Sequence, residues 1–314
     1  MGVGKIICIT PVKHIEGVYE NLCSLGEVIY EPYITYDELK EKITESGNSI
    51  TTIFTNPNKQ QFKLDKELLK YSTVSHIITA STGLNHIGGY FKKSFPEGIH
   101  SLTKEYDIIE QISSTAEHAF TLMTSLIRNV PKSFQDATVG NWNYEKFIGR
   151  QLNNMTIGII GYGRLGTMMS KYCQAFGMRV IYHDPPKGYE DLDYLLERAD
   201  VISLHVHVDE DTKYMINKKT LGKMKKDSYI VNTSRGEIVN ERDVIDSLES
   251  GHLKGYATDV LENEFDNIEN SPILHGANRG LNIIITPHIG GMTKEAQEIA
   301  YNGIINKVKE KYNG

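Results

Sequence analysis

The chain of 314 residues has few cysteines, one tryptophan, no excess of positive charge and no long hydrophobic run. Three cysteines in a chain of this length do not make a disulfide framework. No segment approaches the ~18 apolar residues that a membrane-spanning helix needs. Acidic residues outnumber basic ones by 40 to 34, which disfavours nucleic acid as a ligand because phosphate binding needs a basic surface. The first residues show no secretory signal pattern, so we expect a cytoplasmic protein.

Short apolar runs alternate with helical patterns in two blocks, and the length predicts two domains at ~150 residues each. A long helix expected from about Thr115 to Asn129, and closed by Pro131, separates the blocks. The alternation predicts an α/β protein with two doubly wound parallel-sheet domains. We expect the first domain at residues 1–104 and 293–314, with the C-terminal helix crossing back to it, and the second at 105–292. The region from Gly83 to about Ser114 is expected to be less regular.

The sharpest local motif is a glycine-rich turn, Gly161-Tyr-Gly163-Arg164-Leu165-Gly166, between an apolar run and a helical pattern. Gly161 permits a tight turn, Gly163 lets a pyrophosphate approach the backbone, and Gly166 lets helix and strand pack closely. The amides that open the helix would hold the phosphates. Asp184 ends the next strand, 18 residues after Gly166, where an acid accepts hydrogen bonds from an adenosine ribose. This order favours a dinucleotide, and NAD over NADP, against the alternative of a glycine turn without a ligand.

Three later strands are each followed by a polar side chain: Arg235, Glu264 and His288. Each alone has an ordinary explanation, as a solvated cation, a loop acid or a core histidine. Together they place a guanidinium, a carboxylate and an imidazole at the sheet edge where ligands bind. An imidazole can supply a proton near neutral pH, a carboxylate stabilises its charged form, and a guanidinium can grip a substrate carboxylate. The set suits redox chemistry on a small anionic carbonyl compound.

The ordered motifs resemble those of the D-isomer-specific 2-hydroxyacid dehydrogenase family over almost the whole chain. The matching segments are residues 81–87, Ala116-Glu117-His118, Gly140-Asn-Trp142, the glycine turn, and residues 232–236, 258–264 and 286–291. The resemblance implies a flavodoxin-like substrate domain (1–104 and 293–314) and a Rossmann cofactor domain (105–292). It also implies closure of the cleft on binding and a homodimer formed through the cofactor domains, around the long helix after Thr115.

The resemblance also implies roles for particular residues. Arg235 would bind the substrate carboxylate, His288 would be the acid/base, and Glu264 would tune His288 through a hydrogen bond. Backbone amides around Thr82 and Gly83 would hold the substrate carboxylate from the first domain. The cofactor would be NAD, bound by the glycine turn, Asp184 and residues at later strand ends: His205, His207, Thr233, Ser234, Asp259, His288 and Gly290.

Several positions depart from the family's pattern. His207 stands where proline is usual, Asn85 replaces a common acid, and Gln111 replaces a common asparagine. The segment 101–110 also differs from the common interdomain crossing. These changes bear on substrate identity more than on reaction class. Selectivity is expected to depend on loops near residues 11–12, 56–57 and 81–82.

We expect the partner to be a small 2-oxo or 2-hydroxy acid, with neither nucleic acid nor membrane as a ligand. One alternative is an NAD(H)-sensing, corepressor-like binding protein. Another is a dehydrogenase of formate or phosphite, against which Glu264 counts because formate enzymes usually carry glutamine there. The chain ends soon after its final helix, so an appended regulatory domain is not expected, although a short form acting on a phosphorylated substrate stays open. No metal site is expected, since the scattered histidines lack partners at metal-ligand spacing: His14, His76, His86 and His275.

Overall fold

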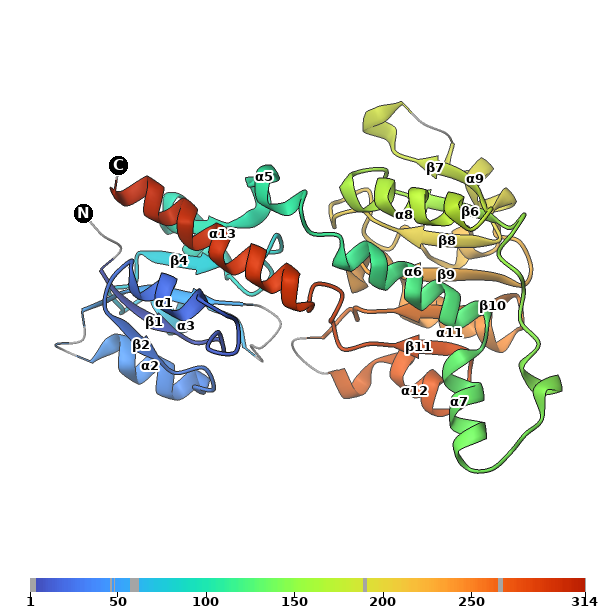
Figure 1. The fold of residues 1–314 in the computed structure, drawn as a ribbon, viewed down its shortest axis with the longest axis horizontal. Helices are drawn as coiled ribbons and strands as arrows, with labels where there is room; N and C mark the ends of the chain where they lie inside the picture. The colour runs from blue at the N-terminus through green and yellow to red at the C-terminus, as the bar shows by residue number, and fades with distance from the viewer. Residues whose placement is uncertain are drawn as a thin grey trace. The chain divides into compact units, whose positions relative to one another are not determined.

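The computed structural model describes residues 4–45, 47, 49–56, 62–188, 191–264 and 268–313. The chain divides into two compact units, the first comprising residues 1–112 and 292–314 and the second residues 113–291 (Figure 1). Each unit is a parallel sheet covered by helices on both faces, so the predicted fold class is confirmed. Among the described residues, no helix is long and apolar enough to span a membrane.

The first unit is built on a five-stranded parallel sheet with the order β2-β1-β3-β4-β5. The strands are β1 (Lys5–Cys8), β2 (Val28–Tyr30), β3 (Ile50–Thr55), β4 (His76–Thr79) and β5 (Ile99–Ser101). The central strands are almost continuous runs of buried residues, chiefly aliphatic residues and threonine, as expected of a sheet that is covered on both faces. The strand order is that of a flavodoxin-like, doubly wound sheet.

Two groups of helices cover this sheet. One face packs against α1 (Val18–Cys23), α5 (Tyr106–Ile109) and α13 (Lys294–Asn313). The other face packs against α2 (Tyr36–Thr44), α3 (Lys66–Leu69) and α4 (Gly89–Ser94). The stripe of α13 that meets the sheet repeats at helical spacing and contains Tyr301, Ile304, Ile305 and Val308.

The region after Gly83 contains more regular secondary structure than the sequence predicted. It contains α4, β5 and α5, and β5 pairs with β4 from Ile99 to Ser101. The strand was missed because Ile99-His100-Ser101 offers a single aliphatic side chain to any pattern. Residues 105–112 also belong to the first unit rather than to the second, because Ile108 and Ile109 pack in the same core cluster as α13.

The second unit is built on a six-stranded parallel sheet with the order β11-β10-β9-β8-β6-β7. The strands are β6 (Thr156–Ile160), β7 (Arg179–His183), β8 (Val201–Leu204), β9 (Ser228–Asn232), β10 (Leu253–Thr258) and β11 (Ile283–Ile285). Strand β6 lies between β7 and β8, so the chain reverses its winding direction at the carboxyl end of β6. Such a switch point is where doubly wound sheets bind their ligands.

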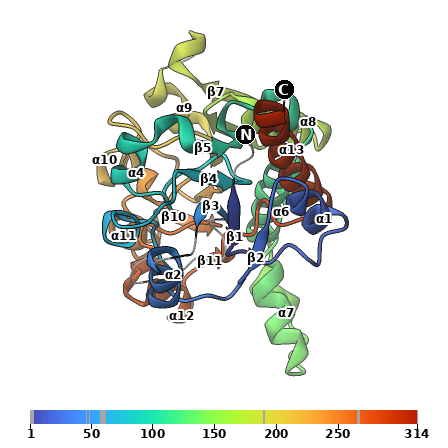
Figure 2. The same ribbon diagram turned by 90° about the vertical axis from the view of Figure 1, so that its left-hand side faces the viewer.

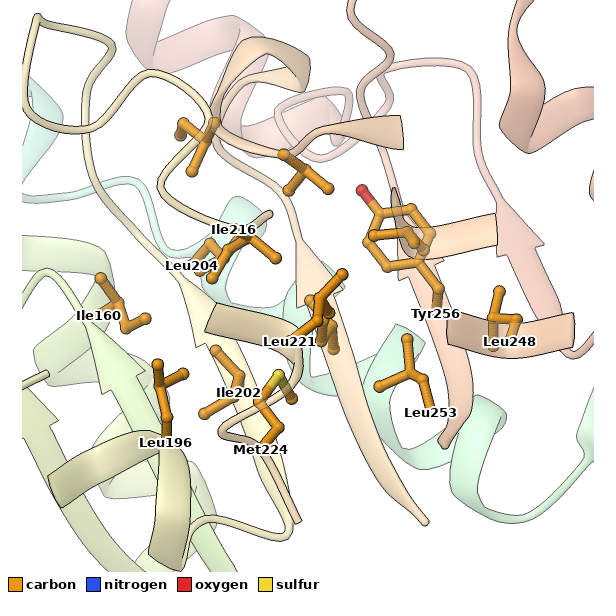
Figure 3. Close-up of a cluster of buried hydrophobic side chains, with 14 of the residues drawn as sticks. Ile160, Leu196, Ile202, Leu204, Ile216, Leu221, Met224, Leu248, Leu253 and Tyr256 are labelled. Atoms are coloured by element: carbon orange, nitrogen blue, oxygen red, sulfur yellow. The ribbon is translucent and has the colours of Figure 1, made fainter. Parts of the chain in front are cut away.

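Helices α6 (Ser114–Ile127) and α8 (Arg164–Ala175) cover one face of this sheet. The other face is covered by α9 (Leu192–Arg198), α10 (Lys218–Leu221), α11 (Glu241–Glu249) and α12 (Pro272–Asn278). Figure 3 shows part of the core on this face, in which Ile202 and Leu204 of β8 and Tyr256 of β10 lie in one cluster with Ile216 and Leu221. Both faces of the central strands are therefore buried, which fixes the positions of the strand ends.

The expectation that Pro131 closes the long helix was wrong in one respect. Helix α6 ends at Ile127, but Pro131 lies in the first turn of another helix, α7 (Val130–Thr138). Asn129 adopts a left-handed conformation, with φ of 54°, and turns the chain between the two helices. Proline is favoured in a first turn because its missing N–H has no partner there anyway. Helix α7 projects away from the sheet of its unit (Figures 1 and 2).

Candidate active site

The glycine turn joins β6 to α8 and satisfies the geometry of a phosphate cradle. A Cβ on Gly161 would lie 2.5 Å from the His205 carbonyl oxygen, and one on Gly166 would lie 2.1 Å from the Gly161 carbonyl oxygen. Gly161 also has φ of +88°, so glycine is required there. A Cβ on Gly163 would meet no atom within 4 Å. The turn is thus tightly packed on its protein side and open at Gly163, where the first amides of the 12-residue helix α8 can bind an anion.

Asp184 follows β7 and is tied directly to this turn. Its Oδ2 accepts a hydrogen bond from the Tyr162 amide at 2.7 Å, and the Gly161 amide donates to the His183 carbonyl at 2.8 Å. The Tyr162 ring stacks on Tyr182 with centroids 3.9 Å apart. The hydrogen bond to Oδ2 therefore holds Asp184 beside the glycine turn and the first residues of α8.

The two histidines after β8 lie in different environments. His205 shares a hydrogen bond with Ser203 at 2.9 Å, while its Nδ1 is buried and has no partner among the described residues. Burial lowers the pKa of His205 to about 4, so its imidazole is neutral at physiological pH. His207 is exposed, and its carbonyl oxygen accepts a hydrogen bond from the Thr212 hydroxyl. The structure thus separates His205, which belongs to the interior wall of the strand ends, from His207 on the surface.

The segment after β9 is fixed by its own side chains. The Asn232 side chain donates to the Arg235 carbonyl at 2.9 Å and accepts from the Ser234 amide at 3.0 Å. The Ser234 hydroxyl donates to the Leu204 carbonyl at 2.6 Å, which ties this loop to the end of β8. Thr233 is buried beside it. The partly buried Arg235 side chain leaves this loop and donates to the Ser234 carbonyl at 2.6 Å.

Gly236 brings the loops after β9 and β10 into contact. A Cβ at this position would lie 2.1 Å from the Leu261 carbonyl carbon and 2.2 Å from the Glu262 amide nitrogen. Backbone atoms cannot yield to a side chain there, so only glycine permits this approach. The loop that carries Arg235 and the loop that carries Glu264 are therefore neighbours.

Asp259 is the centre of a buried network at the end of β10. Its carboxylate accepts hydrogen bonds from the amides of Ile289 and Gly290, at 2.9 and 2.8 Å, and from the Thr286 hydroxyl. His118 of α6 approaches the same carboxylate at 3.3 Å. Burial by itself raises the pKa of Asp259, but the bonds from His118, Thr286 and the two amides outweigh it, so the net pKa lies below its ordinary value. Sequence reasoning placed His118 in a motif without giving it this function.

His288 and Glu264 form the pair that the sequence predicted. His288 Nδ1 lies 2.9 Å from Glu264 Oε1, and their side chains are 30% and 15% exposed. The backbone of His288 is left-handed, with φ of 54°, and its amide donates to the Asp259 carbonyl at 2.9 Å. A positive φ is unfavourable for histidine, and such strain concentrates at functional sites. The Asp259 network thus fixes the loop that carries the imidazole.

The first unit offers different groups at the carboxyl end of β4. The Thr103 hydroxyl donates to the Thr82 carbonyl at 3.0 Å, and the Ser81 hydroxyl donates to the Gly83 carbonyl at 2.7 Å. Among the described residues, none accepts a hydrogen bond from the Thr82 or Gly83 amide. Asn85 is exposed.

A hollow of about 330 Å³ lies beside the ends of β1 and β3 in the same unit. Its lining includes Pro11 and Asn56, from two of the loops that were expected to set selectivity. Pro57, expected in the same role as Asn56, lies outside the described residues. Gln111 donates to the Asp107 carbonyl at 2.7 Å and so closes a local turn.

Most of the second unit matches a known protein family. Residues 120–290 match the family described as D-isomer specific 2-hydroxyacid dehydrogenase, NAD binding domain. The D-3-phosphoglycerate dehydrogenase of Methanocaldococcus jannaschii is 30% identical over 327 residues, which cover 99% of this chain and 58% of that protein. The chain spans between about a third and three fifths of the length of the first curated relatives that it matches.

Solved structures match almost the whole chain. An NAD-dependent formate dehydrogenase from Staphylococcus aureus, solved in complex with NAD, is 25% identical with a TM-score of 0.82, covering 98% of this chain and 96% of that one. A glyoxylate reductase from Paecilomyes thermophila is 27% identical with a TM-score of 0.80, covering 99% and 95%.

Proposed function

Because the chain belongs to the D-isomer-specific 2-hydroxyacid dehydrogenase family and carries its NAD-binding domain, we propose that it reduces a small 2-oxo acid to the D-2-hydroxy acid. The observation that carries the proposal is the His288–Glu264 pair, 2.9 Å apart, on the sheet edge that also holds the glycine turn. Bound NADH would supply the hydride. The residues of this chain would bind the substrate, orient it and exchange the proton.

His288 supplies the proton in this proposal. Its Nδ1 is engaged by Glu264, so Nε2 is the atom that exchanges a proton with the substrate's 2-oxo oxygen. In the reductive direction the imidazolium gives up this proton as the carbonyl carbon is reduced, and in the oxidative direction the neutral ring takes it back. The Glu264 carboxylate stabilises the charged ring and keeps its orientation.

Arg235 binds the substrate. Its guanidinium offers paired N–H donors that match a carboxylate, and its charge polarises the adjacent 2-oxo group. The Thr82 and Gly83 amides of the first unit are also proposed as donors to a substrate carboxylate. Main-chain amides are suited to this role because they are uncharged, so little free energy is lost when substrate binding removes water from them.

The cofactor would lie along the carboxyl edge of the second sheet. The amides of Gly163, Arg164 and Leu165 at the start of α8 would hold the pyrophosphate, and Asp184 would accept hydrogen bonds from the adenosine ribose. A carboxylate repels a 2′-phosphate, which supports NAD over NADP. The remaining contacts are proposed for residues at later strand ends: His205, Thr233, Ser234, Asp259, Gly290 and, at the outer rim, His207.

We also propose a homodimer formed through the second unit. No residue of helix α7 is fully buried within one chain. Phe134 is 66% exposed, and Trp142, just beyond the helix, is 91% exposed. Such an exposed apolar surface is typical of an interface. Sedimentation equilibrium of Phe134→Glu should show monomer where the unaltered chain shows dimer, and an unaltered chain that sediments as a monomer would contradict this.

The proposed activity is tested by loss of NADH absorbance with a panel of 2-oxo acids that covers glyoxylate, hydroxypyruvate, pyruvate, phenylpyruvate and branched-chain members. A phosphorylated 2-oxo acid and the reverse reaction with formate complete the panel. We expect turnover with NADH well above NADPH, and loss of turnover in Arg235→Ala with NADH binding retained. NADH binding without turnover on any member would favour a nucleotide-sensing protein, and near-normal rates in Arg235→Ala would refute the substrate site.

A further inference from the structure

Three polar side chains meet on the α13-covered face of the first sheet, away from the residues of the proposed reaction. His76 opens β4, His100 lies within β5, and Tyr312 lies in the last turn of α13. His100 pairs with Ile78, and His76 lies two residues before Ile78 on the same strand. Side chains two apart on a strand share a face, so both histidines point to the side that α13 covers. Figure 1 shows α13 lying along β4 within this unit.

The donor atoms of the three side chains converge. His76 Nδ1 and His100 Nε2 are 3.5 Å apart, and the Tyr312 hydroxyl lies 3.3 Å from each of them. The two imidazole planes are within 22° of parallel, with centroids 5.6 Å apart. In a tetrahedral zinc site with bonds of ~2.0–2.1 Å, neighbouring ligand atoms lie ~3.3 Å apart. The three atoms therefore have the spacing of one face of such a tetrahedron.

We propose that His76, His100 and Tyr312 form a binding site for one divalent transition-metal ion of the zinc type. Among the described residues, no group of three histidine, cysteine, aspartate or glutamate side chains could hold a metal ion, so the phenol is what completes this set. The three protein donors leave a fourth position for water. Sequence spacing concealed the site, because the two histidines come from different strands and Tyr312 from the end of the chain.

The surroundings keep the imidazoles in the form that binds metals. Burial lowers the pKa of His100 to about 4, and Lys311 and His76 add to that shift. Burial also lowers the pKa of His76, again with a contribution from Lys311. Both shifts favour the neutral imidazole, which is the form that binds a metal ion. Two nitrogen donors and a phenol oxygen suit zinc, copper or nickel rather than magnesium or calcium, which prefer oxygen ligands alone.

Two neighbouring charged groups set limits on the affinity. The Lys311 ammonium, which donates to the Glu97 carbonyl at 3.3 Å, opposes a second cation nearby. Burial raises the pKa of Tyr312, and Glu97 adds to that shift, which disfavours the phenolate form that binds a metal ion more strongly. The bound ion would join the last turn of α13 to β4 and β5, and it would stabilise the first unit by mass action.

The test is titration of the full chain, freed of metals with a chelator, with Zn²⁺ alone by calorimetry and with Co²⁺ alone by visible absorption. We expect one Zn²⁺ per chain, a Co²⁺ spectrum of tetrahedral type and a higher Tm with the ion. His100→Phe should lower the affinity by at least ~100-fold, and Tyr312→Phe, which removes only the hydroxyl, by ~10-fold. His275→Ala, which removes an exposed histidine of the second unit, is the control for adventitious binding and should leave the affinity unchanged.

The proposal fails if the unaltered chain binds no ion saturably at micromolar concentration. It fails equally if Tyr312→Phe and His76→Phe bind Zn²⁺ as tightly as the unaltered chain does. Tyr312→Phe keeps the ring and its packing, so the test stands even if His100→Phe does not fold. None of these residues belongs to the proposed reaction, so the outcome is independent of whether 2-oxo acids are reduced.

Discussion

Two buried titratable groups, one in each unit, differ in how many hydrogen bonds they receive. In the second unit the buried carboxylate of Asp259 is surrounded by donors, and its pKa lies below the ordinary value despite burial. In the first unit the buried imidazole of His86 is 1% exposed, and neither ring nitrogen has a partner among the described residues. Burial lowers the pKa of His86 to about 4, with a smaller contribution from Lys92, so this ring is neutral.

This difference follows from what each sheet edge presents. A carboxylate can be buried in its charged form only where several N–H or O–H donors converge on it. The second unit supplies such donors from the loop after β11, and it therefore holds the Asp259 carboxylate in its charged form. The first unit presents main-chain amides and hydroxyls around Thr82 and Thr103, which need no such support. The comparison predicts that the chemistry depends on side chains of the second unit and on the backbone of the first.

The largest effect should come from removing the imidazole of the second unit. His288→Asn retains a residue that tolerates φ of 54° but cannot exchange a proton, so kcat should fall by ~10²–10⁴-fold while NADH binding is kept. Thr82→Val is the matched change in the first unit, and it should cost less than ~10-fold because the proposed contact there is a main-chain amide. Steady-state kinetics and NADH titration measure both. Equal losses in the two variants would break the comparison.

The sequence predicted the parts of the site that are local. The glycine turn and Asp184 belong to consecutive elements, and Arg235, Glu264 and His288 each follow a strand, so the parallel sheet gathers them at one edge. Partners that come from distant elements were missed. His118 reaches Asp259 from a helix more than a hundred residues earlier, and no spacing in the sequence marks that contact.

The fold could likewise be predicted where the sequence pattern is local. The prediction was wrong where the pattern is too short or ambiguous. Strands that read as apolar runs were found, whereas β5, with one aliphatic residue in a stretch of three, was not. A proline that ends one helix can equally open the next, and only the left-handed turn at Asn129 decides that Pro131 does the second. Whether a proline ends or begins a helix thus depends on backbone geometry, which the residue pattern alone does not give.

The next largest effect concerns acid stability of the first unit. His86 is uncharged in the folded chain down to a pKa of about 4, whereas its ordinary pKa is 6.5, so the unfolded chain takes up this proton first. His86 therefore lowers stability as pH falls from 6.5 toward 4, by up to roughly 3 kcal/mol. His86→Leu should remove this part of the pH dependence of stability. Hydrogen exchange of peptides from the first unit, measured between pH 4 and 7, checks this. His275→Leu, at an exposed position, should leave the dependence unchanged, and an unaltered slope in His86→Leu would contradict the assignment.

A smaller effect is expected from the buried carboxylate of the second unit. Asp259→Asn leaves one of the amides of Ile289 and Gly290 without an acceptor, at a cost of about 2 kcal/mol. The stability due to a lowered carboxyl pKa is present above the ordinary value and lost as pH falls through the folded value. Urea unfolding should therefore separate the two proteins at pH 7 and bring them together in strong acid. Asp211→Asn, at an exposed position of the same unit, is the control, and a constant difference at every pH would argue against the network.

The smallest effect tests how the loop of Glu264 is positioned. Glu241, 5% exposed, accepts the Glu262 amide at 3.0 Å on Oε1 and the Ser271 hydroxyl at 2.8 Å on Oε2. Burial raises its pKa, although these bonds counteract part of the shift. Glu241→Gln can keep both contacts, because the Ser271 hydroxyl can accept as well as donate, so the stability loss should be about 1 kcal/mol or less.

The effect of Glu241 on catalysis can be measured separately from its effect on stability. Glu241 binds the Glu262 amide, and Glu264 lies only two residues further along the same loop. A looser loop weakens the His288–Glu264 contact, so Glu241→Gln should lower kcat by less than ~10-fold and shift the pH profile of kcat/KM, with NADH affinity unchanged. Glu249→Gln lies on the same helix but pairs with Arg279 on the surface, and it should alter neither quantity. A stability loss in Glu241→Gln without any change in the pH profile would mean that the carboxylate supports the fold alone. A shifted profile would mean that the second unit positions both members of the proposed catalytic pair through a buried acid, His288 through Asp259 and Glu264 through Glu241.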